Sequence, residues 1–499
     1  MKASSYRDKW YVLKKEGCDA KAIERLSRQI AYSFLDHYLK DCRYEDDYID
    51  LLCEITTFSD DPILSNPGAR ALFRIIVETL CDDFEELQTA TYNKVMAQVI
   101  SYCRNIPAGK QLDLTLQHFG IHSHRDVLDR VTRIRANGVS LSRDKPLRKI
   151  LLLSRVTIGA DVAITSIIIQ RLSKAFPEAE IVLIGENKLE EIYQGNPGIR
   201  IRKVSYSRKG GLLARLSSWH VVLQVVEEEL STCPLEETIL VDPDSRLTQL
   251  GILPVIPLDH YFFFDSRSDT SLNRKMSMPE LTNFWLNSVI GQEGFCFPKV
   301  WIPESYLNPA ERFCRNLRND GAERIIVVNF GVGGNLRKRI GRRLEENLLL
   351  TLLKEPKTVI ILDKGYGDEE EATIDSLIGS IKEHGHFVYH TSFGSLRHEQ
   401  MTSGLIGVTS RIAEIAALIA ESNEFIGYDS ACQHISAALE TPCVTIFAGS
   451  NNMRFIRRWS AHGQKSCDIV HVDTLTNPDT INVEDITARI MHVRSIRNQ

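Results

Sequence analysis

The sequence predicts an α/β protein with two doubly wound parallel sheets in succession, preceded by an α-helical domain. From Lys149 onward, short apolar runs alternate with amphipathic segments, and this rhythm restarts at Ile325. Before Gly138, glycines are few and apolar residues recur at three- and four-residue steps, which is typical of helices. We therefore expect a helical domain at 1–145, a first α/β half at 146–312 and a second half at 313–499.

The composition is that of an ordinary globular protein. The chain has 499 residues, 43% of them hydrophobic and 25% charged, and its 60 basic and 65 acidic side chains give a net charge of −5. So small an imbalance excludes a protein whose whole surface binds nucleic acid. No stretch has the roughly 20 apolar residues of a membrane span, and the N-terminus lacks the apolar core of a secretory signal. The 11 scattered cysteines include no C-x-x-C pair, so we expect reduced thiols in a cytoplasmic protein.

In the N-terminal region, apolar stripes predict helices and prolines predict their ends. Two sets of residues each share one helix face: Ile23, Leu26, Ile30 and Phe34, then Leu72, Ile75, Ile76 and Leu80. Pro62 and Pro67 are expected to separate helices. This region contains no catalytic motif, and acidic stretches such as 44–47 are interpreted as solvated faces.

The remainder alternates between strands and helices. Buried strands are expected at 150–153, 181–184, 238–241, 262–264, 325–328, 359–362 and 444–447, with helices at 161–176 and 483–494. Asn482 is expected to cap the last helix. In open parallel sheets ligands bind beyond the carboxyl ends of the strands, so the cleft between the two halves is the expected site.

The first strand-to-loop transition, 154–162, contains Asp161 beside a helix N-terminus. Its carboxylate can be read as a helix cap that accepts N–H groups of the first turn. It can also be read as a base in the cleft that takes a proton from an acceptor hydroxyl. Position alone favours the cap.

The second transition is the glycine-rich turn Asn329-Phe330-Gly331-Val332-Gly333-Gly334-Asn335, followed by a basic cluster that includes Lys338. Such a turn lets the backbone approach a phosphate, and the cluster supplies charge. The spacing is neither the dinucleotide fingerprint nor a P-loop. A structural loop with a solvated basic stretch explains the pattern equally well.

The third transition, 425–439, is a strand end, a polar turn and a helix of small residues. Asp429 and Ser430 fit the capping position, and the helix N-terminus suits an anion. Cys432 at this helix start is interpreted either as a thiol of low pKa or as a small packed residue.

Together these motifs resemble the bacterial heptosyltransferase family of glycosyltransferases. The third is similar to that family's D-S-G-x-x-H stretch and its A-A-A-L-G-x-P continuation. The first is similar to the R-x-x-x-x-G-D-V-x-x-T start, with Arg155, Asp161, Val162 and Thr165 at matching places. The resemblance covers about residues 147–463. The chain departs from the pattern at Ala160 in place of glycine, at Ala431-Cys432-Gln433 in place of G-P-M, and at Ile340 in place of tryptophan.

The resemblance implies a GT-B fold, in which two Rossmann-like halves face a cleft and the second holds a nucleotide-diphosphate sugar. It implies an inverting transfer without metal or other cofactor. By position, Asp161 is then the general base and Lys338 neutralises the leaving diphosphate. The remaining donor-side residues are Gly331, Gly333, Gly334, Asn335, Glu369 or Glu370 at the ribose, Asp429, Ser430, Ala431, Gln433 and His434. Arg155 and Thr157 lie on the acceptor side. A carboxylate beside a helix N-terminus is expected to have a lowered pKa unless it is buried.

Three further patterns carry less weight. Asp242-Pro243-Asp244 matches a metal-binding D-x-D, although the two-sheet context argues against that role. His384, His386 and His390 lie near a short strand and are interpreted as partly exposed rather than metal-bound. Arg454, Arg457 and Arg458, before Trp459, are read equally well as a solvated loop or as a site for phosphate or an anionic acceptor.

The leading hypothesis is a cytoplasmic glycosyltransferase that moves a hexose or heptose from a nucleotide sugar to a hydroxyl of a glycan, lipid-linked or protein acceptor. Work at the inner membrane face fits this hypothesis, and nucleic acid is not an expected partner. The helical domain is expected to dock the acceptor or to form a homo-oligomer. Two alternatives stay open: a nucleotide-sugar epimerase or hydrolase of the same fold, and a binding protein that has lost catalysis.

Overall fold

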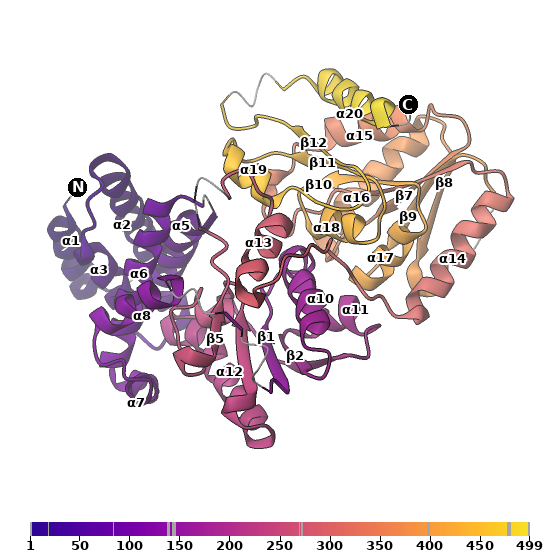
Figure 1. Ribbon diagram of the computed structural model, residues 1–499. Helices are drawn as coiled ribbons and strands as arrows, with labels where there is room; N and C mark the ends of the chain where they lie inside the picture. The colour runs from indigo at the N-terminus through magenta and orange to yellow at the C-terminus, as the bar shows by residue number, and fades with distance from the viewer. Residues whose placement is uncertain are drawn as a thin grey trace.

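The computed structural model describes residues 2–17, 19–82, 84–136, 140–141, 146–268, 270, 273–396, 400–476 and 481–497. The chain forms three parts in sequence order (Figure 1). An indigo and violet helical domain is followed by a magenta α/β half, and an orange and yellow α/β half completes the chain.

The helical domain is built as its apolar stripes predict. Its α-helices are α1 Ala3–Glu16, α2 Ala20–Asp41, α3 Asp46–Thr57, α4 Pro62–Arg70, α5 Glu78–Asp82, α6 Glu86–Asn105, α7 Lys110–His118 and α8 His124–Ala136, and a π-helical segment, Ala71–Val77, joins α4 to α5. Ile23, Ile30 and Phe34 on α2 are all at most 1% exposed. Their burial confirms the predicted helix face.

The expectation that Pro67 separates two helices is wrong, because Pro67 lies inside α4. Pro62, in contrast, stands at the start of this helix, where a missing N–H costs nothing. Pro67 gives up one backbone hydrogen bond, and the helical path continues into the π-helical segment. Packing holds the interrupted helix in place: a methyl group on Gly68 would stand 2.7 Å from Oγ1 of Thr56 on α3.

The first α/β half contains a five-stranded sheet of order β3-β2-β1-β4-β5. All its strand pairs are parallel. The strands are β1 Lys149–Leu153, β2 Glu180–Gly185, β3 Ile199–Lys203, β4 Thr238–Asp242 and β5 Tyr261–Phe263. Its α-helices are α9 Ile158–Ala160, α10 Ser166–Ala175, α11 Glu190–Tyr193, α12 Leu212–Thr232 and α13 Met278–Ile290, with a π-helical segment at Asp161–Thr165.

The second α/β half contains a seven-stranded parallel sheet of order β12-β11-β10-β6-β7-β9-β8. The strands are β6 Arg324–Asn329, β7 Thr358–Asp363, β8 Val388–Ser392, β9 Gly404–Thr409, β10 Glu424–Tyr428, β11 Cys443–Phe447 and β12 Cys467–His471. Its helices are α14 Glu304–Asn319, α15 Arg342–Leu352, α16 Asp368–Glu383, α17 Ile412–Ala420, α18 Ala431–Ala438, α19 Met453–Trp459 and α20 Val483–Arg497. Asn482 caps α20 by accepting the N–H of Asp485 at 2.9 Å.

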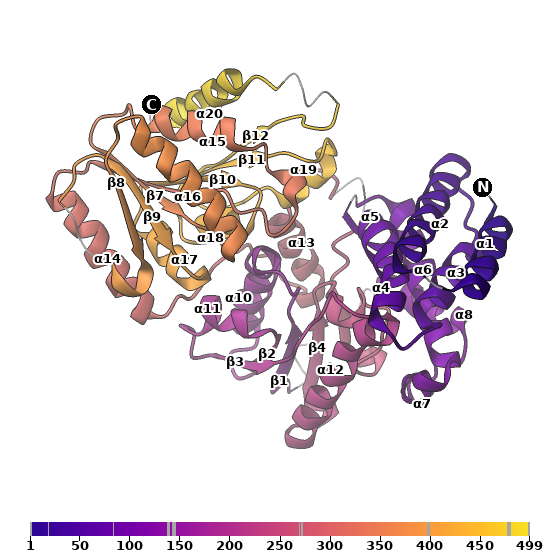
Figure 2. The ribbon, with the colours of Figure 1, turned by 180° about the vertical axis from the view of Figure 1, so that it is seen from behind.

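The two halves face each other in the GT-B arrangement. Seen from behind, α10 and α11 of the first half lie beneath α17 and α18 of the second (Figure 2). The expected boundary at 312/313 falls inside α14, which packs on α17 and therefore belongs to the second half. The expected boundary at 145/146 adjoins residues 142–145, which lie outside the described residues.

The helical domain is fused to the first half through a shared apolar core. One buried cluster runs from helical residues such as Trp10 and Ile100 through Trp219 on α12 to Leu151 and Leu240 on the sheet. Burial of one face of the sheet therefore depends on the helical domain. The domain is an integral part of the fold and not a separately packed appendage.

Candidate active site

The strand order of the second half brings two of the predicted loops together. β6 and β10 are direct neighbours, with Asn329 opposite Gly427. From this pair the chain proceeds to β7 on one side and to β11 on the other, which makes their carboxyl ends the switch point of the sheet. The glycine-rich turn follows β6 and the polar turn follows β10. Ligands of open parallel sheets bind at this position.

Lys338 and Asp429 form the central contact between these two loops. Nζ of Lys338 lies 2.5 Å from Oδ2 of Asp429, and Nε2 of Gln433 donates to the other carboxylate oxygen at 2.6 Å. The Asp429 side chain is 7% exposed and that of Lys338 is 24% exposed. The ammonium group of Lys338 is therefore held, partly exposed, beyond the carboxyl ends of β6 and β10, where it can bind an anion.

A second ion pair anchors the loop that carries Lys338. Arg339 donates to both carboxylate oxygens of Glu345 on α15, at 2.7 and 2.6 Å. The hydroxyl of Tyr428 donates to the same carboxylate at 3.2 Å and accepts the N–H of Ile340 at 3.2 Å. Ile340 stands where the resembled family has a tryptophan, and the loop is held by the Arg339–Glu345 ion pair and by the hydrogen bond from Ile340 to Tyr428.

Helix α18 places polar side-chain atoms that lack hydrogen-bond partners among the described residues beside the Lys338–Asp429 ion pair. Oε1 of Gln433 and Nδ1 of His434 are buried and have no hydrogen-bond partner among the described residues. Burial and the nearby Lys338 ammonium lower the pKa of His434 to about 3, so its ring is neutral at pH 7. Ser430 stands at the N-cap and Ala431 begins the helix, where backbone N–H groups are unpaired. Unpaired buried polar atoms of this kind fit a ligand that carries hydroxyl and phosphate oxygens.

The glycine-rich turn is open and strongly curved. Gly333 and Gly334 have φ values of 61° and 84°, which only glycine adopts readily, and a Cβ at either position would meet nothing within 4 Å. Gly331 donates its N–H to Oδ1 of Asn329 at 2.9 Å. Asn335 accepts the N–H of Arg337 at 3.3 Å and so turns the chain toward Lys338.

The two acidic candidates on α16 lie in different places. The Glu370 carboxylate accepts the N–H of Tyr366 at 2.9 Å and lies 3.7 Å from a Cβ built on Gly331. It therefore borders the glycine-rich turn. Glu369 instead lines a separate hollow with Arg342 of α15.

Asp161 does not cap a helix. The N-cap of α9 is Thr157, four residues earlier, and the Asp161 carboxylate points back to the end of β1. It accepts the N–H of Arg155 at 2.7 Å and the hydroxyls of Ser154 and Thr165, both at 2.8 Å. The side chain is fully buried, and burial raises its pKa to about 6. Burial is the exception to the lowered pKa expected beside a helix N-terminus, and at Asp161 burial outweighs the hydrogen bonds that favour the charged form.

The acceptor-side candidates differ in their surroundings. Thr157 is exposed at the start of α9. The guanidinium of Arg155 is buried in the first half, where it pairs with Asp244 at 3.2 Å and donates to the carbonyl of Pro243 at 2.8 Å. Arg155 thus links the loops that follow the neighbouring strands β1 and β4.

The D-x-D carboxylates both have internal partners. Asp244 pairs with Arg155 and with Arg267, the latter at 2.9 Å, and these cations lower its pKa against the effect of burial. Asp242 accepts the hydroxyls of Thr248 and Tyr261 at 2.5 and 2.6 Å. Within the described ranges, no group of three or more His, Cys, Asp or Glu side chains is arranged to hold a metal ion.

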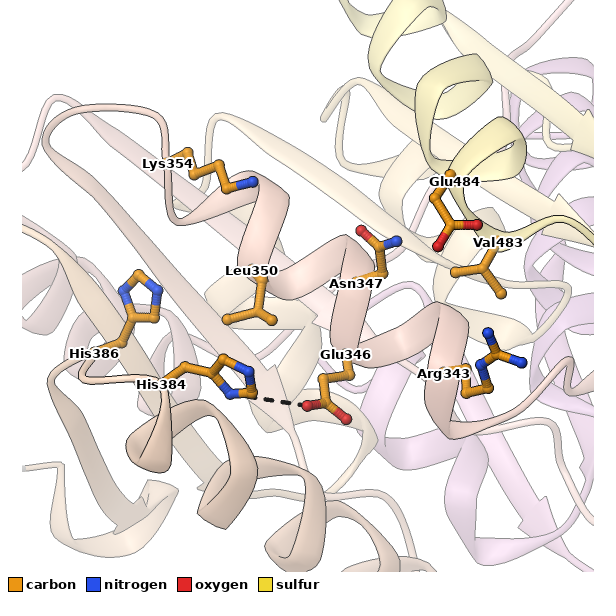
Figure 3. Close-up of a pocket in the computed structure, with 9 residues that line it drawn as sticks. All are labelled: Arg343, Glu346, Asn347, Leu350, Lys354, His384, His386, Val483 and Glu484. Atoms are coloured by element: carbon orange, nitrogen blue, oxygen red, sulfur yellow. Dashed lines mark ion pairs between the residues drawn. The ribbon is translucent and has the colours of Figure 1, made fainter.

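The histidines form part of a different cavity. His384 and His386 line it together with Arg343, Glu346 and Lys354, between α15, the start of α20 and the turn after α16 (Figure 3). Nδ1 of His384 lies 3.9 Å from Oε1 of Glu346. None of the predicted site residues lines this cavity. Cys432 is buried with a raised pKa, which identifies it as a packed thiol and not a reactive one.

Sequence reasoning missed the aromatic side chains of α19. Phe455 lies 5.7 Å beneath Nζ of Lys338, and Trp459 lies 6.1 Å from the His434 ring. The arginines of this segment were read equally well as a solvated loop or as a site for phosphate or an anionic acceptor. They lie on a helix, where Arg454 and Arg458 bind other parts of the molecule. The four-residue spacing of Phe455 and Trp459 was the available signal for a helix with an aromatic face.

One protein-family model matches part of the second half. Residues 382–477 match the model of glycosyltransferase family 9 (heptosyltransferase). The matched segment includes α18 and α19, and so confirms the resemblance read from the third motif. Asp161 and Lys338 lie outside it. Comparison with curated proteins gives no match.

Solved glycosyltransferase structures resemble the chain at low identity. A family 9 glycosyl transferase from Veillonella parvula is 16% identical, with 69% of this chain and 91% of that chain covered and a TM-score of 0.46. ADP-heptose lipopolysaccharide heptosyltransferase II of E. coli is 12% identical, with 70% and 100% covered and a TM-score of 0.46. An E. coli heptosyltransferase solved with ADP is 12% identical, with 69% and 99% covered and a TM-score of 0.44.

Proposed function

We propose that the protein is a glycosyltransferase that moves a hexose or heptose from a nucleoside-diphosphate sugar to a hydroxyl of a glycan, lipid-linked or protein acceptor. The family 9 match supports the reaction class. The observation that carries the proposal is the Lys338–Asp429 pair at the switch point of a GT-B fold, beside the unpaired atoms of Gln433 and His434.

The donor is proposed to bind the second half. Its diphosphate would meet Lys338 and the N-terminal N–H groups of α18, which together supply positive charge without a metal ion. Its ribose hydroxyls would reach the Glu370 carboxylate next to the glycine-rich turn. The sugar would lie against the Asp429-to-His434 segment, where neutral His434 can exchange hydrogen bonds with hydroxyl groups.

The transfer is proposed as a single displacement with inversion. The acceptor oxygen forms a bond to the anomeric carbon while the bond from that carbon to the diphosphate oxygen breaks. Asp161 takes the acceptor's proton, and a pKa of about 6 suits a base that works near neutral pH. The departing nucleoside diphosphate keeps the electron pair, and Lys338 stabilises its added charge. Because the Asp161 carboxylate has no exposed surface, the acceptor can reach it only when the covering residues move.

The direct test is product analysis with ADP-, UDP- and GDP-sugars, in the presence and absence of a glycan acceptor mixture. A transferase releases nucleoside diphosphate in proportion to acceptor glycosylation, and Asp161→Asn lowers both. Nucleoside diphosphate released without acceptor would identify a hydrolase, and a changed sugar without release would identify an epimerase. A protein that binds nucleotide but leaves every donor intact would be the non-catalytic alternative.

Location and partners follow from the same proposal. Within the described ranges, none of the helices combines the length and the hydropathy that a membrane span requires. We propose a cytoplasmic enzyme that reaches lipid-linked acceptors at the inner membrane face. Docking of the acceptor on the helical domain and a homo-oligomer formed through it are further parts of the proposal, and chemical crosslinking with and without acceptor distinguishes them.

A further inference from the structure

Helix α19 contacts all three parts of the molecule next to the proposed donor site. It lies at the edge of the second half that faces α5 of the helical domain (Figures 1 and 2). Arg454 donates to the carbonyl of Phe84 at 2.7 Å. Four residues later, Arg458 donates to the carbonyl of Ser268 in the first half at 3.0 Å. Two successive turns of one short helix therefore hold two different domains.

Phe84 is the apolar contact between the helical domain and α19. Its ring is 6.4 Å from that of Phe455 and 6.2 Å from that of Trp459. Within the described part of α1 to α8, it is the one residue that joins the buried cluster shared by the two α/β halves. Apart from Ala69, the other buried apolar residues described there belong to the cluster shared with the first half.

The backbone of Phe84 supports a specific role for this contact. Its φ is 55°, in the left-handed region that a bulky residue rarely adopts. Such a conformation persists only when its surroundings hold it, and here the side chain is 4% exposed and lies beside two aromatic rings of α19. An ion pair at 3.3 Å between Arg454 and Glu85 adds to the attachment.

The other side of α19 reaches the proposed donor and acceptor residues. Phe455 lies beneath the Lys338 ammonium, and Trp459 lies edge-on to the His434 ring. The guanidinium of Arg155, from the first half, is 6.0 Å from the ring centre of Trp459. A displacement of α19 would therefore shift the groups packed against Lys338, His434 and Arg155 at once.

We propose that Phe84 and Arg454 are positioning residues through which the helical domain holds α19 against the donor site. This inference rests on the proposed function, because it assigns the held groups to nucleoside-diphosphate binding. The helical domain then serves donor binding directly, in addition to any role with an acceptor. No reacting group is supplied by Phe84 itself.

The test compares Phe84→Ala with Leu87→Ala, a control on α6 whose side chain is 51% exposed. Arg454→Gln is a second variant, which removes the ion pair without opening a cavity in case Phe84→Ala does not fold. Hydrogen exchange of the amides at 453–459 reports whether α19 is held. Calorimetric titration with ADP, UDP and GDP reports donor-site affinity.

Both positioning variants are expected to exchange faster at 453–459 and to bind the preferred nucleotide roughly three- to thirtyfold more weakly. The control should match the wild type in both measurements. Unchanged nucleotide affinity in both variants would overturn the inference, whatever happens to exchange. If the wild type binds none of the three nucleotides, the proposed function fails, and the inference that α19 is positioned for donor binding fails with it. Unchanged hydrogen exchange at 453–459 in the variants would separately refute the attachment of α19 through Phe84.

Discussion

Gly159 of the first half lies directly against His434 of the second. A methyl group at Gly159 would stand 3.1 Å from Cδ2 of His434 and 3.2 Å from the Cα of Ala431. The absence of a side chain lets α9 approach α18, which brings the segment that carries Asp161 beside the proposed donor site. The two halves thus share a buried apolar cluster and approach each other closely at Gly159.

Enlarging this position is expected to separate the halves without unfolding them. Gly159→Val would force α9 and α18 apart, and we expect kcat/KM to fall by at least tenfold, because a misplacement of about 1 Å can cost 10²-fold in rate. Gly379→Val on α16 is the matched control, since a Cβ there meets nothing within 4 Å. Equal activities of the two variants would show that close approach at Gly159 is not required.

The pH dependence of turnover is expected to follow Asp161. With a pKa of about 6, the base is ionised above pH 6, so log(kcat/KM) should rise with a slope near one below pH 6 and level off above it. Asp161→Asn should remove at least 10²-fold of activity and abolish this limb. A wild-type profile that is flat between pH 5 and 8 would contradict the assignment.

The same carboxyl group is expected to reduce stability at neutral pH. Its pKa is raised from 3.8 to about 6, so the native state holds the proton more tightly than the unfolded chain between those pH values. The resulting loss of unfolding free energy is absent below pH 4, grows between pH 4 and pH 6, and is fully present above pH 6, where it amounts to about 3 kcal/mol. Asp161→Asn should therefore be at least as stable as the wild type in urea unfolding at pH 7. A clear loss of stability would show that the charged form is favoured in the fold.

The two neighbouring glutamates are expected to behave differently. Glu370 borders the glycine-rich turn, so Glu370→Gln should raise the KM for the donor roughly tenfold through loss of a charged hydrogen-bond acceptor. Glu369→Gln should leave KM unchanged, because Glu369 faces another hollow. Steady-state kinetics with varied donor would reveal the reverse order if Glu369 were the ribose ligand.

Asp244 of the D-x-D pair is expected to stabilise the fold. Asp244→Asn would leave the buried guanidinium groups of Arg155 and Arg267 without their carboxylate, at a cost of about 3–5 kcal/mol in unfolding free energy.

Chelation of metal ions is expected to leave activity intact. Activity after treatment with EDTA should equal that of the untreated enzyme. Restoration of a lost activity by Mg²⁺ or Mn²⁺ would instead assign a metal role.

Much of the architecture follows from local patterns. The apolar runs at Ile150, Ile325 and Val444 predicted buried strands, and each lies in a parallel sheet. Such strands can be predicted from the sequence because strands covered on both faces have apolar residues at nearly every position. The strand β3, by contrast, reads Ile-Arg-Ile-Arg-Lys and was not predicted, because it lies at a sheet edge with exposed basic side chains.

The site could be predicted only where its residues adjoin strand ends. Lys338 and Asp429 are 91 residues apart, and their 2.5 Å contact follows from the adjacency of β6 and β10, which a single sequence does not specify. Burial of Asp161 likewise depends on elements distant in sequence, so the direction of its pKa shift could not be read locally. The interdomain contacts of α19 were missed because Arg454 and Arg458 resemble a solvated charge cluster until their partners on other domains are known.

Calorimetric titration of ADP, UDP and GDP into the wild type and Lys338→Ala directly tests nucleoside-diphosphate binding at the Lys338–Asp429 pair. Saturable binding of one nucleoside diphosphate to the wild type is expected. A concentration 100 times Kd should also add about 2.7 kcal/mol to the unfolding free energy. In Lys338→Ala this binding should be lost or weakened by at least tenfold, since Lys338 supplies the charge that meets the diphosphate. Absence of binding by the wild type, or equal binding by the variant, would contradict a nucleoside-diphosphate site at the Lys338–Asp429 pair.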